Sequence, residues 1–232
     1  MEPEIYVDTS EVPSHLRNTA LFRADLLEMR SVLSQKSKVT AFCIHEAGHY
    51  LYFLKMGVPK GAFAFRGPRF RYVVEGGREK VRADMAVIKP DLTVVDFDTF
   101  EEGEHVALAL AKAAAAGGAY TLVLAAEKAS GDEYDKRMFH AHFRHLCEIY
   151  PESLREAQEQ DYWDKGRAAV LRDLRSPKAM NEGWATADWL RPRLFPTQRL
   201  IPDSSNAHSE SAWKISWAKF VKTVSDKLRE VS

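Results

Sequence analysis

Two histidines four positions apart, His45 and His49, and the Glu46 between them are the residues best suited to chemistry. They form the pattern HExxH within residues 38–56, a segment that predicts a helix. Residues i and i+4 lie above one another on one helix face, so both imidazoles could bind a single Zn²⁺. Glu46 is offset by one position, so it could instead hold a metal-bound water and take its proton during attack on a carbonyl. The pattern predicts a hydrolytic zinc site.

The segment around the motif is apolar. Ala41, Phe42 and Ile44 precede it and residues 50–54 follow it, which indicates a helix buried in the core. A buried helix suits the metal site of a zinc peptidase. The alternative is a pair of ordinary core or surface histidines that bind no metal.

Residues 41–57, AFCIHEAGHYLYFLKMG, resemble the zinc helix in the peptidase domain of FtsH-like membrane-anchored AAA+ proteases. The resemblance covers roughly residues 38–150, and HEAGH is its specific part. It implies a zincin-like core and a third zinc ligand, an aspartate about 70–90 residues downstream. In that family the aspartate opens a helix that follows an alanine- and glycine-rich helix.

Two aspartates fit this expectation, Asp132 and Asp135, which lie 83 and 86 residues after His49. Asp132 stands at a natural N-cap position, where a carboxylate would bond backbone N–H groups. Asp135 shares a helix face with Phe139 and further apolar residues, so it would face the interior, where a metal could compensate a buried carboxylate. We favour Asp135 and keep Asp132 as the alternative. Either would complete a His₂Asp site with an open fourth position.

Glu182 is a further candidate ligand. It lies in Asn181–Thr186, NEGWAT, which resembles the segment that supplies a glutamate ligand in gluzincin peptidases. Those enzymes place this glutamate far closer to the HExxH helix than the 133 residues between His49 and Glu182. The segment therefore favours a helix start with a packing tryptophan, Trp184.

Three histidines, His140, His142 and His145, could indicate a second metal site. Only His142 and His145 share a helix face, so three-way coordination from one helix would be poor. Exposed or core-edge histidines are the favoured interpretation. His142 lies on the predicted face of Asp135 and could still support that site.

The chain departs from the resembling family in two respects. It contains no GxxxxGK[ST] nucleotide-binding sequence, and it has no convincing transmembrane helix. Residues 107–126 have about the length of a span, with Lys112 as their only charge, but they are mostly alanine and glycine, which insert weakly. We therefore expect a packed core helix there. The Gly117–Gly118 pair within it predicts a close helix contact or a break.

Composition excludes several function classes. The 33 Lys and Arg residues balance 33 Asp and Glu residues, which argues against a nucleic-acid binder or a polybasic membrane-surface protein. Two cysteines, Cys43 and Cys147, cannot form a disulfide framework, and the first residues lack the features of a signal peptide. A cytoplasmic protein is the expectation.

The predicted helices and strands that surround the motif indicate an α+β fold. We expect a mainly helical zincin-like core with a small antiparallel or mixed sheet between the zinc helix and the later helices. We expect three parts: an N-terminal arm and helix, a zinc peptidase-like core, and a helical C-terminal extension, at residues 1–37, 38–150 and 151–232. The apolar periodicity predicts helices at residues 14–36, 38–56, 102–128, 133–149, 152–174, 178–190 and 211–229. The predicted strands are Phe63–Arg66, Phe70–Val74, Met85–Ile88 and Leu92–Phe97.

These features together predict a zinc-dependent metallopeptidase with Glu46 as general base and then general acid. A strand beside the metal could pair with a polypeptide substrate, which favours endopeptidase action. Without its own motor, the enzyme would act on flexible or unfolded segments, as a homo-oligomer or with a separate unfoldase partner. The alternative function is a non-catalytic, zinc-stabilised protein-interaction domain derived from a peptidase. Glu46 argues against it, because a structural zinc site needs no base and normally closes its fourth position.

Overall fold

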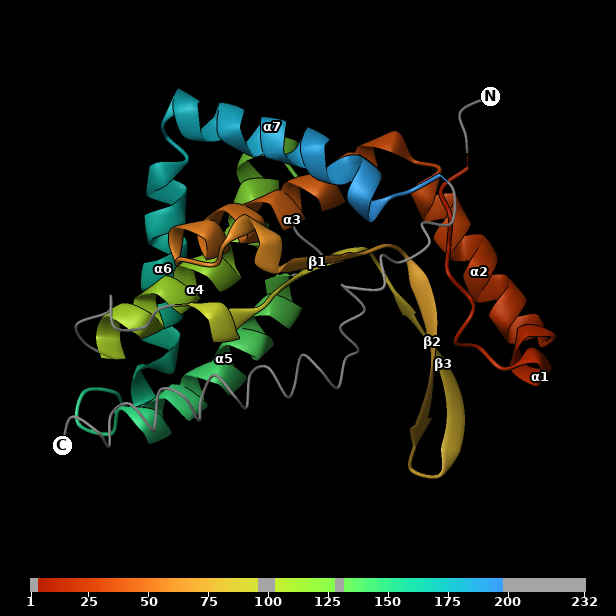
Figure 1. Ribbon diagram of the computed structural model, residues 1–232, viewed down its shortest axis with the longest axis horizontal. Coiled ribbons are helices and arrows are strands. Elements are labelled where there is room, and N and C mark those ends of the chain that lie inside the picture. Colours follow the sequence, from red (N-terminus) through yellow and green to blue (C-terminus); the bar gives the residue numbers. More distant parts are fainter. Residues whose placement is uncertain (1–3, 96–102, 128–131, 198–232) are drawn as a thin grey trace.

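Helices dominate the computed structural model, which describes residues 4–95, 103–127 and 132–197, and a small antiparallel β part completes the predicted α+β fold (Figure 1). The helices are α1 (Ser14–Arg17), α2 (Ala20–Leu33), α3 (Lys36–Lys55), α4 (Gly103–Tyr120), α5 (Asp132–Ile149), α6 (Glu159–Asp173) and α7 (Pro177–Leu194). The strands are β1 (Phe63–Arg66), β2 (Arg69–Glu75), β3 (Arg78–Asp84) and β4 (Val87–Pro90).

The centre of the molecule is the contact between α3 and α4, where small residues bring the two backbones together. A Cβ added at Gly48 would lie 2.5 Å from the carbonyl oxygen of Ala116. A Cβ added at Gly117 would lie 2.4 Å from Nε2 of His49. The glycine pair in the alanine-rich helix therefore marks a close helix contact, as one of the two sequence-based alternatives predicted.

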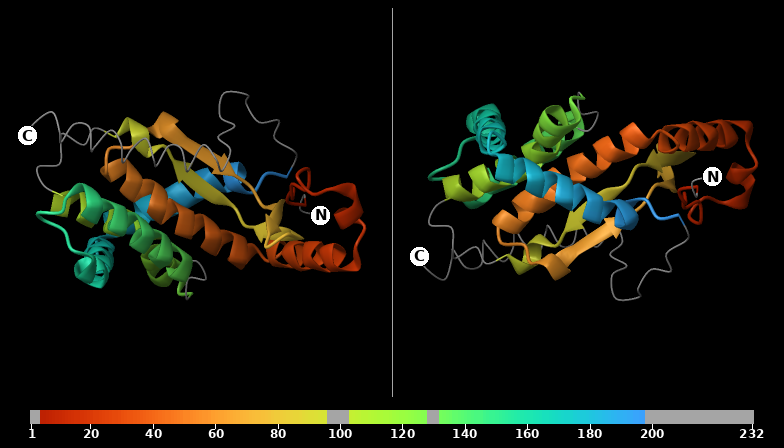
Figure 2. Two further views of the ribbon diagram at one scale, coloured as in Figure 1. Left: turned by 90° about the horizontal axis from the view of Figure 1, so that it is seen from below. Right: turned by 90° about the horizontal axis from the view of Figure 1, so that it is seen from above.

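The later helices pack on this pair. α6 lies along α4, where Gly166 faces Ala111, and α7 crosses α3, as both views of Figure 2 show. One hydrophobic core runs through all of these elements, from Val12 near the N-terminus to Phe195 at the end of α7.

One helical stretch in the described part of the chain, Gly103–Ala125, is long and apolar enough to cross a membrane. Of its most apolar window, 67% is buried inside the protein. α3, α5 and α6 all pack against α4 and cover most of this apolar surface, whereas Leu122 and Val123 near its end are 45% and 39% exposed.

The strands form two antiparallel pairs. β1 pairs with β4, with Phe65 opposite Ile88, and β2 pairs with β3 in a hairpin that extends away from the helices (Figure 1). Gly76 and Gly77 form the hairpin turn with φ of 59° and 74°, values that favour glycine. β4 lies against α3, and the Tyr50 ring of α3 packs on Phe63 and Phe65 of β1, so this pair is the part of the β structure that borders the HExxH motif.

The predicted β structure differs from the observed one in two places. β3 was not predicted, because its charged residues leave no alternating apolar face, and the hairpin turn rather than burial determines its pairing. Leu92–Val94 forms a turn of 3₁₀ helix instead of a strand. Part of the predicted strand Leu92–Phe97 lies outside the described residues.

Two of the predicted helices also differ. The predicted helix at residues 14–36 is split, because the Thr19 hydroxyl accepts a hydrogen bond from the Phe22 N–H and caps a new helix, α2. The predicted helix at residues 152–174 begins only at Glu159, after a 3₁₀ turn in which the Gln158 side chain accepts from the Arg155 N–H. The predicted helix at residues 211–229 lies outside the described residues.

Candidate metal centre

Three side chains from two helices converge beside the α3–α4 contact. His45 and His49 come from the middle of α3, and Asp135 comes from the first turn of α5. The two Nε2 atoms lie 3.1 Å apart, and Oδ2 of Asp135 lies 3.1 Å from Nε2 of His45 and 3.3 Å from Nε2 of His49. These residues form a group that could hold a metal ion.

The spacing of the three atoms fits a small tetrahedral ion. Ligand atoms bonded at about 2.0–2.2 Å in a tetrahedral site are about 3.4 Å apart, close to the distances found here. The three side chains are 10–14% exposed, and Oδ2 of Asp135 is buried without a hydrogen bond. A buried carboxylate oxygen without a hydrogen bond is costly, so the donor set and its burial fit a bound cation.

In each histidine, the hydrogen bond made by Nδ1 leaves Nε2 to face the centre. Nδ1 of His49 lies 2.8 Å from the carbonyl oxygen of Ala113, which can only accept, so Nδ1 carries the proton. The Thr121 hydroxyl donates to the Gly117 carbonyl at 2.9 Å, so its oxygen accepts from Nδ1 of His45 at 3.5 Å. Both histidines therefore direct an Nε2 lone pair toward Asp135, as metal-binding histidines do.

α4 thus supports the centre with parts that the sequence analysis did not assign. Ala113 orients His49, and Thr121, only 4% exposed, orients His45. Thr121 begins a π-helical turn that ends at Ala125, an irregularity frequent at functional sites. A signal was present in the sequence, because Thr121 follows Gly117 by four residues and shares its helix face.

The charges of the neighbouring side chains shift the pKa values of His49 and Asp135. Burial alone would lower the pKa of His49, but the nearby carboxylates of Asp135 and Glu46 raise that pKa to about 9. Burial alone would raise the pKa of Asp135, but His49 and His45 hold that pKa well below its usual range. In the metal-free protein, His49 therefore keeps its positive charge to a higher pH than an ordinary histidine, with Asp135 as its charge partner.

Glu46 lies in the same buried region and faces the β structure. It is 7% exposed, and its Oε2 accepts a hydrogen bond of 2.9 Å from the backbone N–H of Ile88 in β4. Burial raises the pKa of Glu46, although His49 and His45 act in the opposite direction. A raised pKa makes a carboxylate a better proton acceptor at neutral pH.

The other two candidate ligands differ in position. α5 begins at Asp132, whose side chain lies outside the part of the structure that is described. Glu182 is exposed near the start of α7 and is not in the group. Gly183 is the packing residue of its segment, because a Cβ there would lie 2.7 Å from the Tyr120 ring, whereas Trp184 is 39% exposed.

The three histidines of α5 do not gather around a common point. His140 pairs with Glu159 and the exposed His145 pairs with Glu148, so each has a protein partner. Burial, with a contribution from His145, lowers the pKa of His142 to about 4. Among the described residues, only the group at His45, His49 and Asp135 has metal-binding geometry.

No protein-family model matches the chain, and no curated protein or solved structure is significantly similar to it. The residues of this centre are therefore the features of the described structure that indicate a function.

Proposed function

We propose that the protein is a zinc-dependent metallopeptidase that hydrolyses internal peptide bonds. One observation carries the proposal: three lone-pair atoms, Nε2 of His45, Nε2 of His49 and Oδ2 of Asp135, converge within 3.3 Å of one another beside the buried Glu46. Ligands without a base would suit a structural metal, and a base without ligands would suit other hydrolases. Their combination favours metal-assisted hydrolysis.

Zinc is the cation that the donor set favours. Two imidazole nitrogens and one carboxylate oxygen at tetrahedral spacing suit Zn²⁺, whereas Mg²⁺ and Ca²⁺ prefer six or more oxygen ligands. Three protein ligands also leave one position open, which is typical of catalytic rather than structural zinc. A zincin-like identity for the core belongs to the same proposal.

A bound zinc ion would supply a Lewis acid that polarises the scissile carbonyl and lowers the pKa of water. The protein's own contribution would come from Glu46. Its Oε2 is held by the Ile88 N–H, which leaves Oε1 to take a proton from the attacking water. The same carboxyl group would then give that proton to the departing amine. Burial of Glu46 raises its pKa and so supports both transfers.

The substrate would be a flexible or unfolded polypeptide in the cytoplasm. β4 lies beside Glu46 and pairs only with β1 among the described strands. Ile88 gives its N–H on the other edge to Glu46, so this edge could offer an extended chain its carbonyl oxygens. The resemblance to FtsH-like peptidases points the same way. Because the residues of this sequence contain no ATPase motif, a separate unfoldase partner would have to deliver folded substrates, and the peptidase itself could be a homo-oligomer.

The decisive experiment compares the wild type with Glu46→Gln on a permanently unfolded substrate, such as reduced and carboxymethylated casein. We expect equal zinc content by mass spectrometry, internal cleavage by the wild type, and a loss of activity of about a hundredfold or more in the variant. His49→Ala should lose both zinc and activity. A zinc-loaded wild type that cleaves nothing would contradict the proposal.

The hydrogen bond between Glu46 and Ile88 favours a second candidate function, a zinc-stabilised interaction domain, because there Glu46 would only tie β4 to α3. In that case Glu46→Gln would lower the free energy of unfolding, and neither protein would cleave substrate. A zinc ion with four protein ligands, detected by X-ray absorption, would also favour this candidate.

A further inference from the structure

A cavity with both polar and apolar walls lies at the N-terminal end of α3, away from the candidate metal centre. It has a volume of about 590 Å³ and is bordered by the end of α2, the start of α3, the end of α7 and the N-terminal segment. Lys36 lines it nine residues before His45, which corresponds to about 14 Å along the helix. The cavity is therefore separate from the proposed catalytic site.

One wall of the cavity is apolar and rigid. It is formed by Leu33, Val39 and Phe195, whose side chains belong to the hydrophobic core and are 6%, 1% and 4% exposed. Ile5 adds to this wall from the N-terminal segment, which a hydrogen bond from the Tyr6 N–H to the Pro196 carbonyl holds against the end of α7. The wall is thus part of the folded core.

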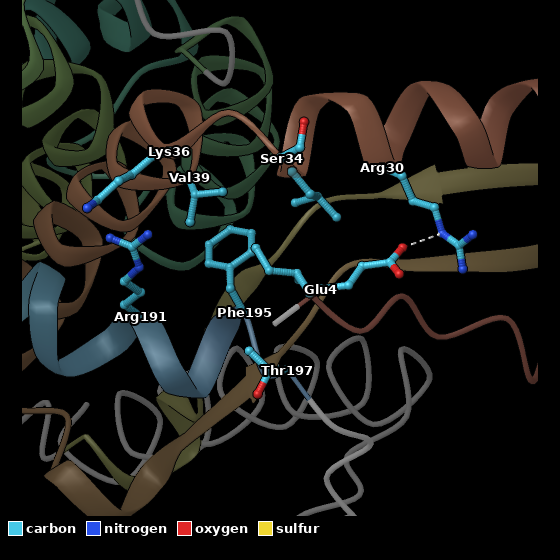
Figure 3. A pocket seen from close by; sticks show the side chains of 10 residues that line it. Glu4, Arg30, Ser34, Lys36, Val39, Arg191, Phe195 and Thr197 are labelled. Atoms are coloured by element: carbon cyan, nitrogen blue, oxygen red, sulfur yellow. Dashed lines mark ion pairs between the residues drawn. The ribbon is translucent and has the colours of Figure 1, made fainter. Parts of the chain in front are cut away.

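The polar side of the cavity carries an excess of positive charge. Glu4 forms an ion pair of 3.1 Å with Arg30, which leaves Lys36 and Arg191. Neither of these two has an ion pair with any residue that the structure describes. Figure 3 shows both side chains among the residues that line the cavity, with Lys36 at the start of α3 and Arg191 near the end of α7.

Two cations that line one cavity without an acidic partner repel, and the start of α3 adds to this repulsion. The first turn of α3 contains no acidic residue, and no side chain caps it. A helix N-terminus carries partial positive charge, so lysine is unfavourable there. An anion placed between Lys36 and Arg191 would relieve both effects, because a guanidinium and an ammonium bind the oxygens of carboxylates and phosphates well.

We propose that this cavity binds a small amphiphile with a single anionic head group. Its carboxylate or phosphate lies between Lys36 and Arg191, and its apolar chain lies along Ile5 and the ring of Phe195. The volume is within the range of about 300–1,000 Å³ that is typical of small-molecule sites. The proposal is independent of peptidase activity, because no residue of the metal centre takes part.

Isothermal titration calorimetry with dodecyl phosphate and with dodecanoate, both below their critical micelle concentrations, tests the proposal. We expect one molecule to bind per chain, at least about tenfold more tightly than inorganic phosphate, because phosphate alone does not use the apolar wall. The pair Lys36→Gln and Arg191→Gln should weaken amphiphile binding by about tenfold or more.

The matched control is the pair Arg175→Gln and Lys178→Gln, which removes two exposed positive charges near the start of α7 and should change affinity less than about twofold. Lys36→Gln alone changes an exposed side chain and provides the test if the double variant does not fold. Undetectable binding to the wild type, equal binding by the double variant, or equal binding of inorganic phosphate would overturn the proposal. Binding only to phosphatidic acid vesicles would also overturn it, in favour of a membrane contact.

Discussion

At the candidate metal centre, Nε2 of His45, Nε2 of His49 and Oδ2 of Asp135 meet in a buried position. The histidines use their Nδ1 protons on Ala113 and Thr121, and Oδ2 of Asp135 has no partner among the described residues other than the two imidazoles. Burial makes this arrangement costly without a cation, because the carboxylate cannot turn to water. The buried position of Oδ2 of Asp135 also makes Asp135 the expected third ligand, which can be tested.

The third ligand can be identified by removing each aspartate in turn. We expect Asp135→Ala to weaken zinc binding by about a hundredfold or more, because it removes an atom in direct reach of the ion. Asp132→Ala serves as the neighbouring control and should retain zinc. Competition with a fluorescent zinc chelator measures both affinities. Loss of zinc from Asp132→Ala alone would reverse the assignment.

The pair of His49 and Asp135 predicts how the stability of the metal-free protein depends on pH. The pKa of His49 rises from its ordinary value of 6.5 to about 9 in the folded state, so the folded state holds a proton that the unfolded chain releases. This contribution is complete below pH 6.5 and disappears as pH rises through about 9. The low pKa of Asp135 means that the contribution also disappears in strong acid.

Urea unfolding in a chelator at pH 6.5 and pH 9.5 tests this prediction. The wild type should lose free energy of unfolding between the two pH values, and Asp135→Asn should show a smaller loss because the charge partner is gone. Zinc affinity should change in the opposite direction and increase with pH, since the metal displaces the proton of His49. A wild-type stability that is constant between the two pH values would contradict the pairing.

Among the elements, the close contact between α3 and α4 determines how much room the two imidazoles have. Gly117 presents its Cα to the two imidazoles, and a Cβ there would approach Nε2 of His49 to 2.4 Å and Nε2 of His45 to 2.7 Å. These are the atoms that face the proposed ion. The packing of two helices and the geometry of the site therefore depend on the same residue.

Gly117→Ala should therefore abolish zinc binding without unfolding α4. Alanine favours a helix over glycine by about 1 kcal/mol, so the far-ultraviolet circular dichroism should be retained while the methyl group displaces the imidazoles. Gly61→Ala is the matched control, because a Cβ there meets nothing within 4 Å. Stoichiometric zinc in purified Gly117→Ala would show that the two helices can separate enough to admit a methyl group.

At the scale of the whole molecule, a bound metal ion would link segments that lie far apart along the chain. His45 and His49 belong to α3, Asp135 belongs to α5, and α4 packs between these helices in one continuous core. An ion that binds only the folded state stabilises it by mass action. Metal binding should therefore stabilise the whole domain and not only the site.

Removal of zinc should lower the melting temperature of the entire protein in a single transition. Free zinc at about a thousand times its Kd contributes about 4 kcal/mol, which for a chain of this size corresponds to roughly 8–16 °C. Calorimetry with added zinc and then with excess chelator measures the shift. Magnesium at the same concentration is the control and should leave the melting temperature unchanged. An equal shift with magnesium would argue against a nitrogen-rich site.

The sequence alone determined the local parts of this protein. The HExxH spacing places His45 and His49 on one helix face, and the apolar periodicity predicts the α+β composition, because both depend on residues within a few positions of each other. The apolar face of α5 was also predictable, since Phe139, Phe143 and Leu146 are all fully buried. The β3 strand was not, because its pairing depends on the hairpin turn rather than on burial.

Only the tertiary structure decided which distant groups meet. It brings Oδ2 of Asp135 within 3.3 Å of both Nε2 atoms, and it turns the carbonyl of Ala113 and the hydroxyl of Thr121 toward the outer nitrogens. It also ties Glu46 to the Ile88 N–H, a backbone contact that leaves no trace in residue types. These contacts depend on how closely α3, α4 and α5 pack. That distance is determined by the shapes of all the side chains between the helices, whereas a motif reports only its own spacing.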